Sequence, residues 1–277
     1  MAVSDRLAGR ALRSVGAVGA GLLVVLLALP LVGLVTRIPP GTLFARLREP
    51  MVLDALRLSL VTSAAATALI VVLGLPVAYL LATRDFTGKR ALELLVDLPM
   101  VLPPTVAGVG LLTAFGRAGL AGGALQFVGI TLPFTTLGVV VAQTFVAAPF
   151  FIRATRAGLS EVDRRYLDAA ATLRTPPYET FLRVMVPLAL PSVLAGAAMG
   201  WARALGELGA TITFAGNMPG VTQTMPLAVY IALQTDLDAA IALSVLLLLV
   251  SLAVLLAVRL LPLRLTLPAA DADRRSR

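Results

Sequence analysis

The chain has 277 residues, of which 58% are hydrophobic and only 14% charged, a composition too apolar for an ordinary soluble domain. It contains no cysteine and no histidine, which removes disulfides, thiolate nucleophiles, imidazole bases and the usual zinc ligands. The net charge of +8 comes from short basic clusters between long apolar runs, so it indicates orientation in a membrane and not a nucleic-acid partner. We therefore expect a membrane protein without a catalytic residue, a metal site or a cofactor of its own.

Six long stretches with few or no charged residues can each supply the roughly 20 apolar residues that a membrane-spanning helix needs. They lie at residues 16–35, 58–82, 92–115, 135–152, 187–208 and 239–258. The glycine-rich segment 118–134 between the third and fourth stretches is expected to be a loop. The sequence therefore predicts an all-α, polytopic membrane protein with about six transmembrane helices.

One further uncharged stretch, between Glu207 and Asp236, is rich in glycine, proline, asparagine and glutamine. Such a segment makes a poor lipid-facing helix. Irregular backbone at membrane depth must line a cavity or lie against protein. We therefore expect a re-entrant segment or an extracytoplasmic gate element here.

The basic residues indicate which ends of the spans face the cytoplasm, because Lys and Arg accumulate in cytoplasmic loops. Most of them fall on one side of the predicted bundle: Arg6, Arg10, Arg13, Arg84, Lys89, Arg90, Arg153, Arg156, Arg164, Arg165, Arg174, Arg183, Arg259, Arg264, Arg274, Arg275 and Arg277. Both termini are therefore expected in the cytoplasm. The segment 37–57 carries four arginines on the outer side, partly balanced by Glu49 and Asp54, so a shifted first span stays an alternative.

The first span follows an N-terminal basic cluster, as a secretory signal would. Its apolar run is too long for the hydrophobic region of a signal peptide, and no small-residue cleavage site follows it. We therefore expect a retained anchor.

The segment 153–187 is the only sizeable polar connection between the predicted spans. Ser160 is a candidate N-cap for a helix over residues 160–173, and Thr175 can cap a second helix with Pro176 at its first position. The two short helices predict an exposed elbow. One short surface of this loop combines three apolar side chains with one acid, and such a surface is suited to a groove on another protein. An amphipathic connector on the membrane surface is an alternative. The surface consists of Asp168, Ala169, Ala170 and Leu173.

The run Asp168-Ala-Ala-Ala-Thr-Leu-Arg174, followed by Val184-Met-Val-Pro187, resembles the loop of bacterial ABC-importer permeases that begins Glu-Ala-Ala, continues to a glycine and ends apolar-x-Leu-Pro. In that family the loop is the coupling helix, which docks into a cleft of the cytoplasmic ATPase. This sequence departs from the pattern at Asp168, where glutamate is usual, and at Arg174, where glycine is usual. A glycine there indicates a left-handed backbone, in which arginine would cost on the order of 1 kcal/mol. The resemblance implies that Asp168, Ala169, Ala170, Leu173, Arg174 and Pro176 couple the chain to its ATPase.

Two other stretches are similar to the molybdate permease subgroup: Leu98-Pro-Met-Val-Leu-Pro-Pro-Thr-Val106, and the run from Ala202 through Asn217 to Pro226. The likeness covers roughly residues 54–256. It implies a type I ABC importer permease fold, with an anchor and outer loop over residues 1–52, a core over 53–261 and a short tail over 262–277. The chain has no phosphate-binding GxxxxGK[ST] loop, which agrees with a permease whose ATPase is a separate protein.

The same resemblance implies import of an oxyanion, most closely molybdate, with sulfate and tungstate as alternatives within the family. It also implies the partners: a second copy of the chain, two cytoplasmic ATPase subunits that use ATP and Mg²⁺, and an extracytoplasmic oxyanion-binding protein. The expected location is the bacterial cytoplasmic membrane, in contact with lipid.

Proline pairs and one charged pair mark the expected path of the substrate. Pro99 and Pro103 in the third span, and Pro187 and Pro191 in the fifth, permit bending, although tolerated kinks are an equal alternative. Arg203 and Glu207 are four residues apart and can bridge each other, either structurally at a dimer interface or in the pore. Small residues and hydroxyls suit a path that passes an anion along without trapping it. The predicted path or gate comprises Pro103, Pro104, Thr105, Arg203, Glu207, Thr211 and Thr213.

Two other classes of protein fit the sequence less well. A self-sufficient ion-coupled carrier or channel is disfavoured by the long cytoplasmic loop and by the scarcity of intramembrane carboxylates. A membrane-embedded enzyme without His or Cys would need a carboxylate pair, and Asp97 and Glu207 are too isolated in the sequence to supply one.

Overall fold

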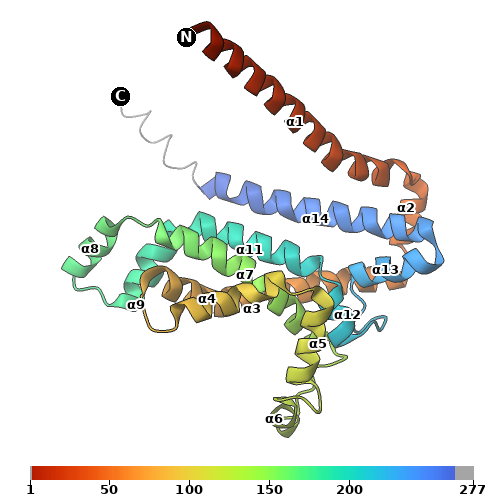
Figure 1. Ribbon diagram of the computed structural model, residues 1–277. Helices are drawn as coiled ribbons and strands as arrows, with labels where there is room; N and C mark the ends of the chain where they lie inside the picture. The colour runs from red at the N-terminus through yellow and green to blue at the C-terminus, as the bar shows by residue number, and fades with distance from the viewer. Residues whose placement is uncertain (1, 266–277) are drawn as a thin grey trace.

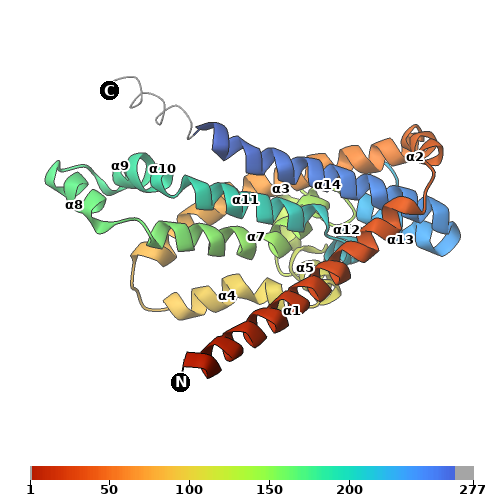
Figure 2. The same cartoon turned by 90° about the horizontal axis from the view of Figure 1, so that it is seen from above.

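The computed structural model describes residues 2–265 (Figures 1 and 2) and consists over this range of helices without a strand, which confirms the predicted all-α fold. Residues 266–277, most of the predicted tail, lie outside the described range. In chain order the helical segments are α1 (Ala2–Thr36), α2 (Pro40–Leu47), α3 (Pro50–Thr83), α4 (Lys89–Val101), α5 (Pro104–Phe115), α6 (Gly122–Phe127), α7 (Thr136–Ser160), α8 (Arg164–Thr172), α9 (Pro177–Thr180), the π-helix η1 (Phe181–Met185), α10 (Val186–Leu188), α11 (Leu190–Leu205), α12 (Gly209–Ala215), α13 (Met225–Thr235) and α14 (Leu237–Leu265).

Four helices are long and apolar enough to cross a membrane: residues Val15–Thr36 of α1, the whole of α3 and α7, and Leu237–Leu256 of α14. They match the predicted first, second, fourth and last spans, and all of these helices continue beyond the predicted bounds. The helix α7 runs on past Ile152 to Ser160, because Thr155, Gly158 and Leu159 in this extension are buried against the bundle. Its two arginines also meet carboxylates of α4. Arg156 lies 2.7 Å from Glu93, and Arg153 lies 3.7 Å from Asp97.

The third predicted span is not one helix, which corrects the expectation of a continuous crossing over residues 92–115. The chain leaves the helical conformation at Leu102 and Pro103, and α5 starts at Pro104. Pro103 and Pro104 lack backbone N–H groups, and each proline disfavours a helical conformation in the residue before it. Consecutive prolines therefore divide the segment into α4 and α5.

The fifth predicted span is bent. Pro177–Leu188 and Leu190–Leu205 together are apolar enough for one crossing, but their axes differ in direction by 77°. Pro187 and Pro191 flank the bend, in agreement with the prediction that this proline pair permits bending. The straight part, α11, starts at Leu190 and ends at Leu205, three residues later and three earlier than predicted.

The core of the molecule is the group of three helices α3, α7 and α11, which lie side by side in both views (Figures 1 and 2). A Cβ atom on Gly74 of α3 would lie 2.9 Å from the ring of the fully buried Phe151 of α7. Two turns further along α7, Gly158 lies directly against Ser192 of α11. Glycines thus let the helix backbones approach closely, which is how helices gain packing contacts in lipid.

The two ends of this core are distinct. The α8 end carries α8 and α9, and the opposite α2 end carries α2 and the junction of α13 with α14 (Figure 1). Charged and polar loop residues make up the α8 end.

The segment predicted as a gate element forms α12, an irregular stretch over residues 216–224, and α13. In the irregular stretch Thr222, Gln223 and Thr224 are buried, and the Ser59 hydroxyl of α3 accepts a 2.7 Å hydrogen bond from the Met225 N–H. The end of the stretch, residues 222–224, is therefore enclosed by protein, as expected for non-helical chain at membrane depth, whereas residues 218–221 are exposed on the single chain.

At the α2 end one arginine joins segments distant in sequence. Arg46 of α2 forms 2.9 Å ion pairs with Glu49 and with Asp236, which lies between α13 and α14. The Asp236 carboxylate also accepts a hydrogen bond from the Ala239 N–H. That backbone bond, with a smaller contribution from Arg46, lowers the pKa of Asp236, and Glu49 is the main cause that raises the pKa of Arg46.

The helix α1 extends away from this bundle (Figures 1 and 2), and none of its spanning segment is buried within the chain. Its apolar side chains therefore require lipid or another protein chain as their surroundings.

We predict that Gly108→Ala destabilises the protein and that Gly110→Ala does not. A Cβ atom on Gly108 would lie 2.5 Å from the Thr213 side chain and 3.0 Å from the Ala210 carbonyl of α12, whereas one on Gly110 would meet nothing within 4 Å. Overpacking of this kind costs about 1–3 kcal/mol, while alanine in an open helical position gains up to about 1 kcal/mol. Thermal unfolding midpoints in detergent measure both variants. Equal midpoints would contradict the close α5–α12 contact.

We predict that the Arg46–Asp236 connection weakens in acid. Because the folded-state pKa of Asp236 lies below its ordinary value of 3.8, its stabilising contribution is present above that value and is lost as the pH falls through the folded pKa. Asp236→Asn should lower the thermal midpoint at pH 7, and the difference from wild type should vanish in strong acid. Asp238→Asn is the matched control and should have little effect at either pH.

Candidate functional site

The coupling loop begins at a different residue from the one predicted. Ser160 is the last residue of α7, where its hydroxyl donates to the Arg156 carbonyl, and it does not cap α8. Asp163 is the N-cap instead, and its carboxylate accepts a hydrogen bond from the Arg165 N–H. The second cap is also shifted by one residue, since Pro176 is the N-cap of α9 and Pro177 is its first residue.

The turn after α8 has the left-handed backbone that the sequence pattern predicts at Arg174, with φ of 55°. The Arg174 N–H donates to the Ala171 carbonyl, and the Thr175 N–H donates to the Ala170 carbonyl. This pair of bonds is the Schellman motif, in which the left-handed position is usually glycine. Arginine thus takes the glycine conformation, at a cost of on the order of 1 kcal/mol.

The side chains of α8 divide into an inner and an outer face. Ala170 is buried and Leu167 packs on the main core, so both hold the helix on the bundle. Asp168, Ala169 and Leu173 are exposed, with Leu173 at 79%. The structure therefore does not place Ala170 on the outer face with the other predicted coupling residues. Arg174 and Pro176 are exposed beside that face.

Two tyrosines that the sequence analysis missed extend the exposed face of the coupling loop. Tyr166 and Tyr178 are 54% and 65% exposed. Tyrosine is enriched at protein interfaces because its ring gives apolar contact and its hydroxyl gives a hydrogen bond. The signal available in the sequence was aromatic residues inside an otherwise polar loop.

The predicted path residues gather where two interrupted helices meet. A Cβ atom on Gly209, the first residue of α12, would lie 2.6 Å from the Cβ of Pro104, the first helical residue of α5. Thr213 lies against Gly108 one turn further on. The break after α4 and the break after α11 therefore lie next to each other.

Glu207 holds this junction together. It is 1% exposed, and one carboxylate oxygen lies 2.7 Å from the Arg203 guanidinium, which confirms that the pair can bridge. The other oxygen accepts a 2.8 Å hydrogen bond from the Ala210 N–H in the first turn of α12. A carboxylate beside the free N–H groups at a helix start is stabilised by the helix dipole. Glu207 thus connects the end of α11 to the start of α12.

The remaining path residues differ in their surroundings. Pro103, Pro104 and Thr105 are exposed on the single chain, whereas Thr211 is fully buried. The Thr213 hydroxyl donates to the Gly209 carbonyl. The structure therefore brings Pro104, Thr105, Arg203, Glu207 and Thr213 to one junction and places Thr211 on the inner face of α12.

The interior near this junction contains a buried amide. Gln143 of α7 is fully buried, and neither end of its amide has a hydrogen-bond partner among the side chains that the structure describes. Among the same side chains, buried polar atoms without partners also occur in Thr144, Thr155, Thr211, Asn217, Gln223 and Thr224.

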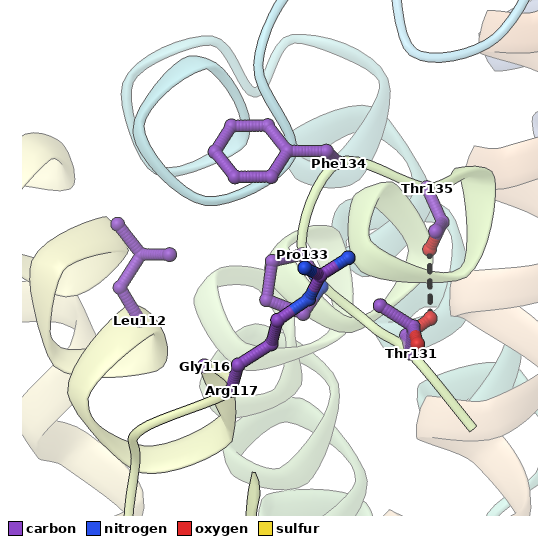
Figure 3. A pocket seen from close by; sticks show the side chains of 7 residues that line it. All are labelled: Leu112, Gly116, Arg117, Thr131, Pro133, Phe134 and Thr135. Atoms are coloured by element: carbon purple, nitrogen blue, oxygen red, sulfur yellow. Dashed lines mark hydrogen bonds between the residues drawn. The ribbon is translucent and has the colours of Figure 1, made fainter. Parts of the chain in front are cut away.

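A pocket of about 510 Å³ lies where α5 ends and α7 begins (Figure 3), at the end of α7 that is opposite α8. Arg117 extends across it towards Pro133, with Leu112 and Phe134 on other sides. The Thr135 hydroxyl donates to the Leu132 carbonyl at 2.7 Å and accepts from the Gly138 N–H, capping α7. Thr131 and Gly116 complete the lining.

Comparison with known proteins identifies the family. Residues 70–267 match the family described as binding-protein-dependent transport system inner membrane component. The molybdenum transport system permease protein ModB of Mycobacterium tuberculosis is 44% identical over 235 residues, which cover 85% of this chain and 89% of that protein. The ModB protein of Escherichia coli is 40% identical over 183 residues, covering 66% of this chain and 80% of that one.

The fold has a counterpart among solved structures. A bacterial alginate ABC transporter, crystallised in complex with an alginate pentasaccharide-bound periplasmic protein, matches with a TM-score of 0.74. The match covers 92% of this chain and 95% of that chain at 14% sequence identity. The predicted permease fold is thereby confirmed, and the chain belongs to the family of binding-protein-dependent transport system inner membrane components.

Proposed function

We propose that this chain is the membrane-spanning permease of an ATP-driven molybdate importer. The observation that carries the proposal is the exposed coupling helix α8, on a chain that shares 44% identity with a molybdenum transport permease. A permease of this kind catalyses no reaction itself. ATP and Mg²⁺ are used by a separate ATPase, and the extracytoplasmic binding protein supplies the oxyanion.

The coupling loop supports the ATPase as partner at the α8 end. Asp168 and Leu173 present one acid and one large apolar side chain next to exposed tyrosines. The helix is held from behind by Ala170 and Leu167, and the segment after it is fixed to α3 by the ring contact between Tyr79 and Phe181, whose centroids are 4.4 Å apart. A surface element fixed to the bundle in this way can transmit a movement of the ATPase to α7 and α11.

The basic clusters support an orientation in a bacterial inner membrane with the α8 end and both termini on the cytoplasmic side. Three exposed features support a homodimer in lipid: the unburied helix α1, the exposed leucines of α4 (Leu94, Leu95 and Leu98), and the exposed break at Pro103. Non-helical backbone at membrane depth requires protein or a water-filled path beside it. A second copy facing Pro103–Thr105 satisfies this requirement and encloses a path between the two chains.

The junction of the interrupted helices is suited to passing a divalent anion. Arg203 supplies positive charge, and its 2.7 Å pairing with Glu207 cancels part of that charge, so an anion is attracted without being held tightly. Thr105 and the buried hydroxyls offer further donors. Substrate selectivity then resides in the binding protein.

We predict that Asp168→Lys uncouples the transporter. Reconstitution in liposomes with the cognate ATPase and molybdate-binding protein should give molybdate-stimulated ATP hydrolysis, which the substitution abolishes by reversing the charge presented to the ATPase. Glu161→Lys, a charge reversal in the same loop at the exposed end of α7, is the matched control and should retain stimulation. Stimulation by sulfate alone would assign the protein to a neighbouring subgroup, and failure to assemble with an ATPase would contradict the permease function.

We predict that Glu207→Gln slows molybdate transport while the protein still folds. Glutamine can still accept the Ala210 N–H hydrogen bond but no longer neutralises Arg203, so the anion is retained longer at the junction. Transport should fall by about tenfold if the change strengthens retention by about 1.4 kcal/mol. Glu207→Ala should instead lower the thermal midpoint, because the buried Ala210 N–H loses its partner. Unchanged transport in Glu207→Gln would show that the pair is only structural.

A further inference from the structure

The pocket around Arg117 lies outside both the coupling loop and the helix junction. Arg117 is the only charged residue between Asp97 and Arg153, so one cation stands alone in a long apolar segment. Among the side chains that the structure describes, those of residues 15–256 apart from 40, 42, 44 and 47, no carboxylate lies within ion-pair distance of it. It is exposed and extends across the pocket towards Pro133 (Figure 3).

The lining of the pocket favours an acidic side chain over a free oxyanion. Leu112, Pro133 and Phe134 form apolar walls, and the Thr135 hydroxyl is already committed to the α7 cap. A bare divalent anion needs several donors and is penalised by apolar surroundings. A carboxylate on an aliphatic stem needs one guanidinium for its head and apolar contact for its stem.

The size of the pocket also favours an acidic side chain over a free oxyanion. Its volume of about 510 Å³ falls within the range of about 300–1,000 Å³ that encloses organic ligands. A five-atom oxyanion would leave most of that space unfilled. One acidic side chain with its apolar neighbours on a protein surface would fill it.

The segment between Arg117 and Thr131, both of which line the pocket, carries exposed apolar side chains. The arm that carries α6 turns away from the bundle (Figure 1), and its Leu120 and Phe127 are 97% and 93% exposed. Large exposed apolar side chains on a segment that leaves the pocket and returns to it are typical of a protein interface.

The pocket is also connected to the helix junction. Phe134 has a left-handed backbone, with φ of 59°, and its N–H donates to the Phe214 carbonyl of α12. Its ring lies so close to Gly216 that a Cβ atom there would be 3.0 Å away. A side chain that enters the pocket therefore touches the residue that contacts the end of α12, the helix that Glu207 caps at its other end.

From these observations we infer that the Arg117 pocket is the socket in which an acidic residue of the extracytoplasmic binding protein anchors. The inference rests on the proposed function, which makes the start of α7, opposite the coupling loop, extracytoplasmic and supplies the partner. Docking at this pocket places the partner against Phe134 and hence within one contact of α12.

The test measures the affinity of the cognate molybdate-binding protein for the permease–ATPase complex in nanodiscs, by biolayer interferometry. Arg117→Glu should weaken docking by about tenfold or more, because glutamate repels the acidic partner residue. Arg117→Gln should weaken docking less, because glutamine only removes the attraction. Arg37→Glu makes the same charge change at another exposed arginine of the outer side and should stay within about twofold of wild type. Basal ATP hydrolysis should be unchanged in every variant.

A charge exchange identifies the partner residue. Single Asp→Lys and Glu→Lys changes across the binding-protein surface should include one that restores docking to Arg117→Glu but weakens docking to wild type. Wild-type affinity in both Arg117 variants, or equal weakening by Arg37→Glu, would overturn the inference. Intact docking with loss of molybdate-stimulated hydrolysis would also overturn it, because Arg117 would then contact the anion. Failure of the wild-type complex to dock the binding protein would instead contradict the proposed function.

Discussion

The organisation of this protein depends on one constraint: within a membrane, each backbone N–H and C=O group needs a partner inside the protein. Helices α3, α7 and α11 satisfy it with their own hydrogen bonds. The chain departs from the helix at Leu102–Pro103 and again at Gly206–Leu208, and it brings these two breaks together. Glu207 binds the Ala210 N–H at the second break, and Gly209 lets it lie against Pro104. The irregular backbone is thus placed where another part of the protein, or a polar path, can surround it.

The same junction relates the two ends of the molecule. On one side α12 contacts Phe134, which lines the Arg117 pocket at the start of α7. On the other side Glu207 follows α11, which packs along α7 towards the coupling loop at the α8 end. The close glycine contacts between α7 and α11 make this pair a stiff unit, since packed interiors transmit displacement instead of absorbing it. A partner protein bound at either end can therefore shift the conformation of the junction through a chain of direct side-chain contacts.

Much of the fold could be predicted because lipid imposes a simple rule on length and polarity. Four spans, the break-prone proline pairs and the left-handed turn at Arg174 follow from local residue properties. The sequence-based predictions were wrong where a local residue preference competed with a tertiary contact. The sequence favours Ser160 as an N-cap, but α7 extends as far as Ser160 because Gly158 and Leu159 are buried against the bundle. Ala170 belongs to the coupling motif, but it is buried since the helix needs one face against the bundle.

The sequence by itself determined the class of the protein, because an apolar composition, charge-free stretches and clustered basic residues depend only on local chemistry. It also determined the coupling loop, whose residues are contiguous. Tertiary structure alone decided which breaks meet, which oxygen of Glu207 caps α12, and that Arg117 shares a pocket with residues that follow it by more than a dozen positions. The physical reason is that such contacts join segments distant in sequence, and only the packing of the helices brings them within reach of one another.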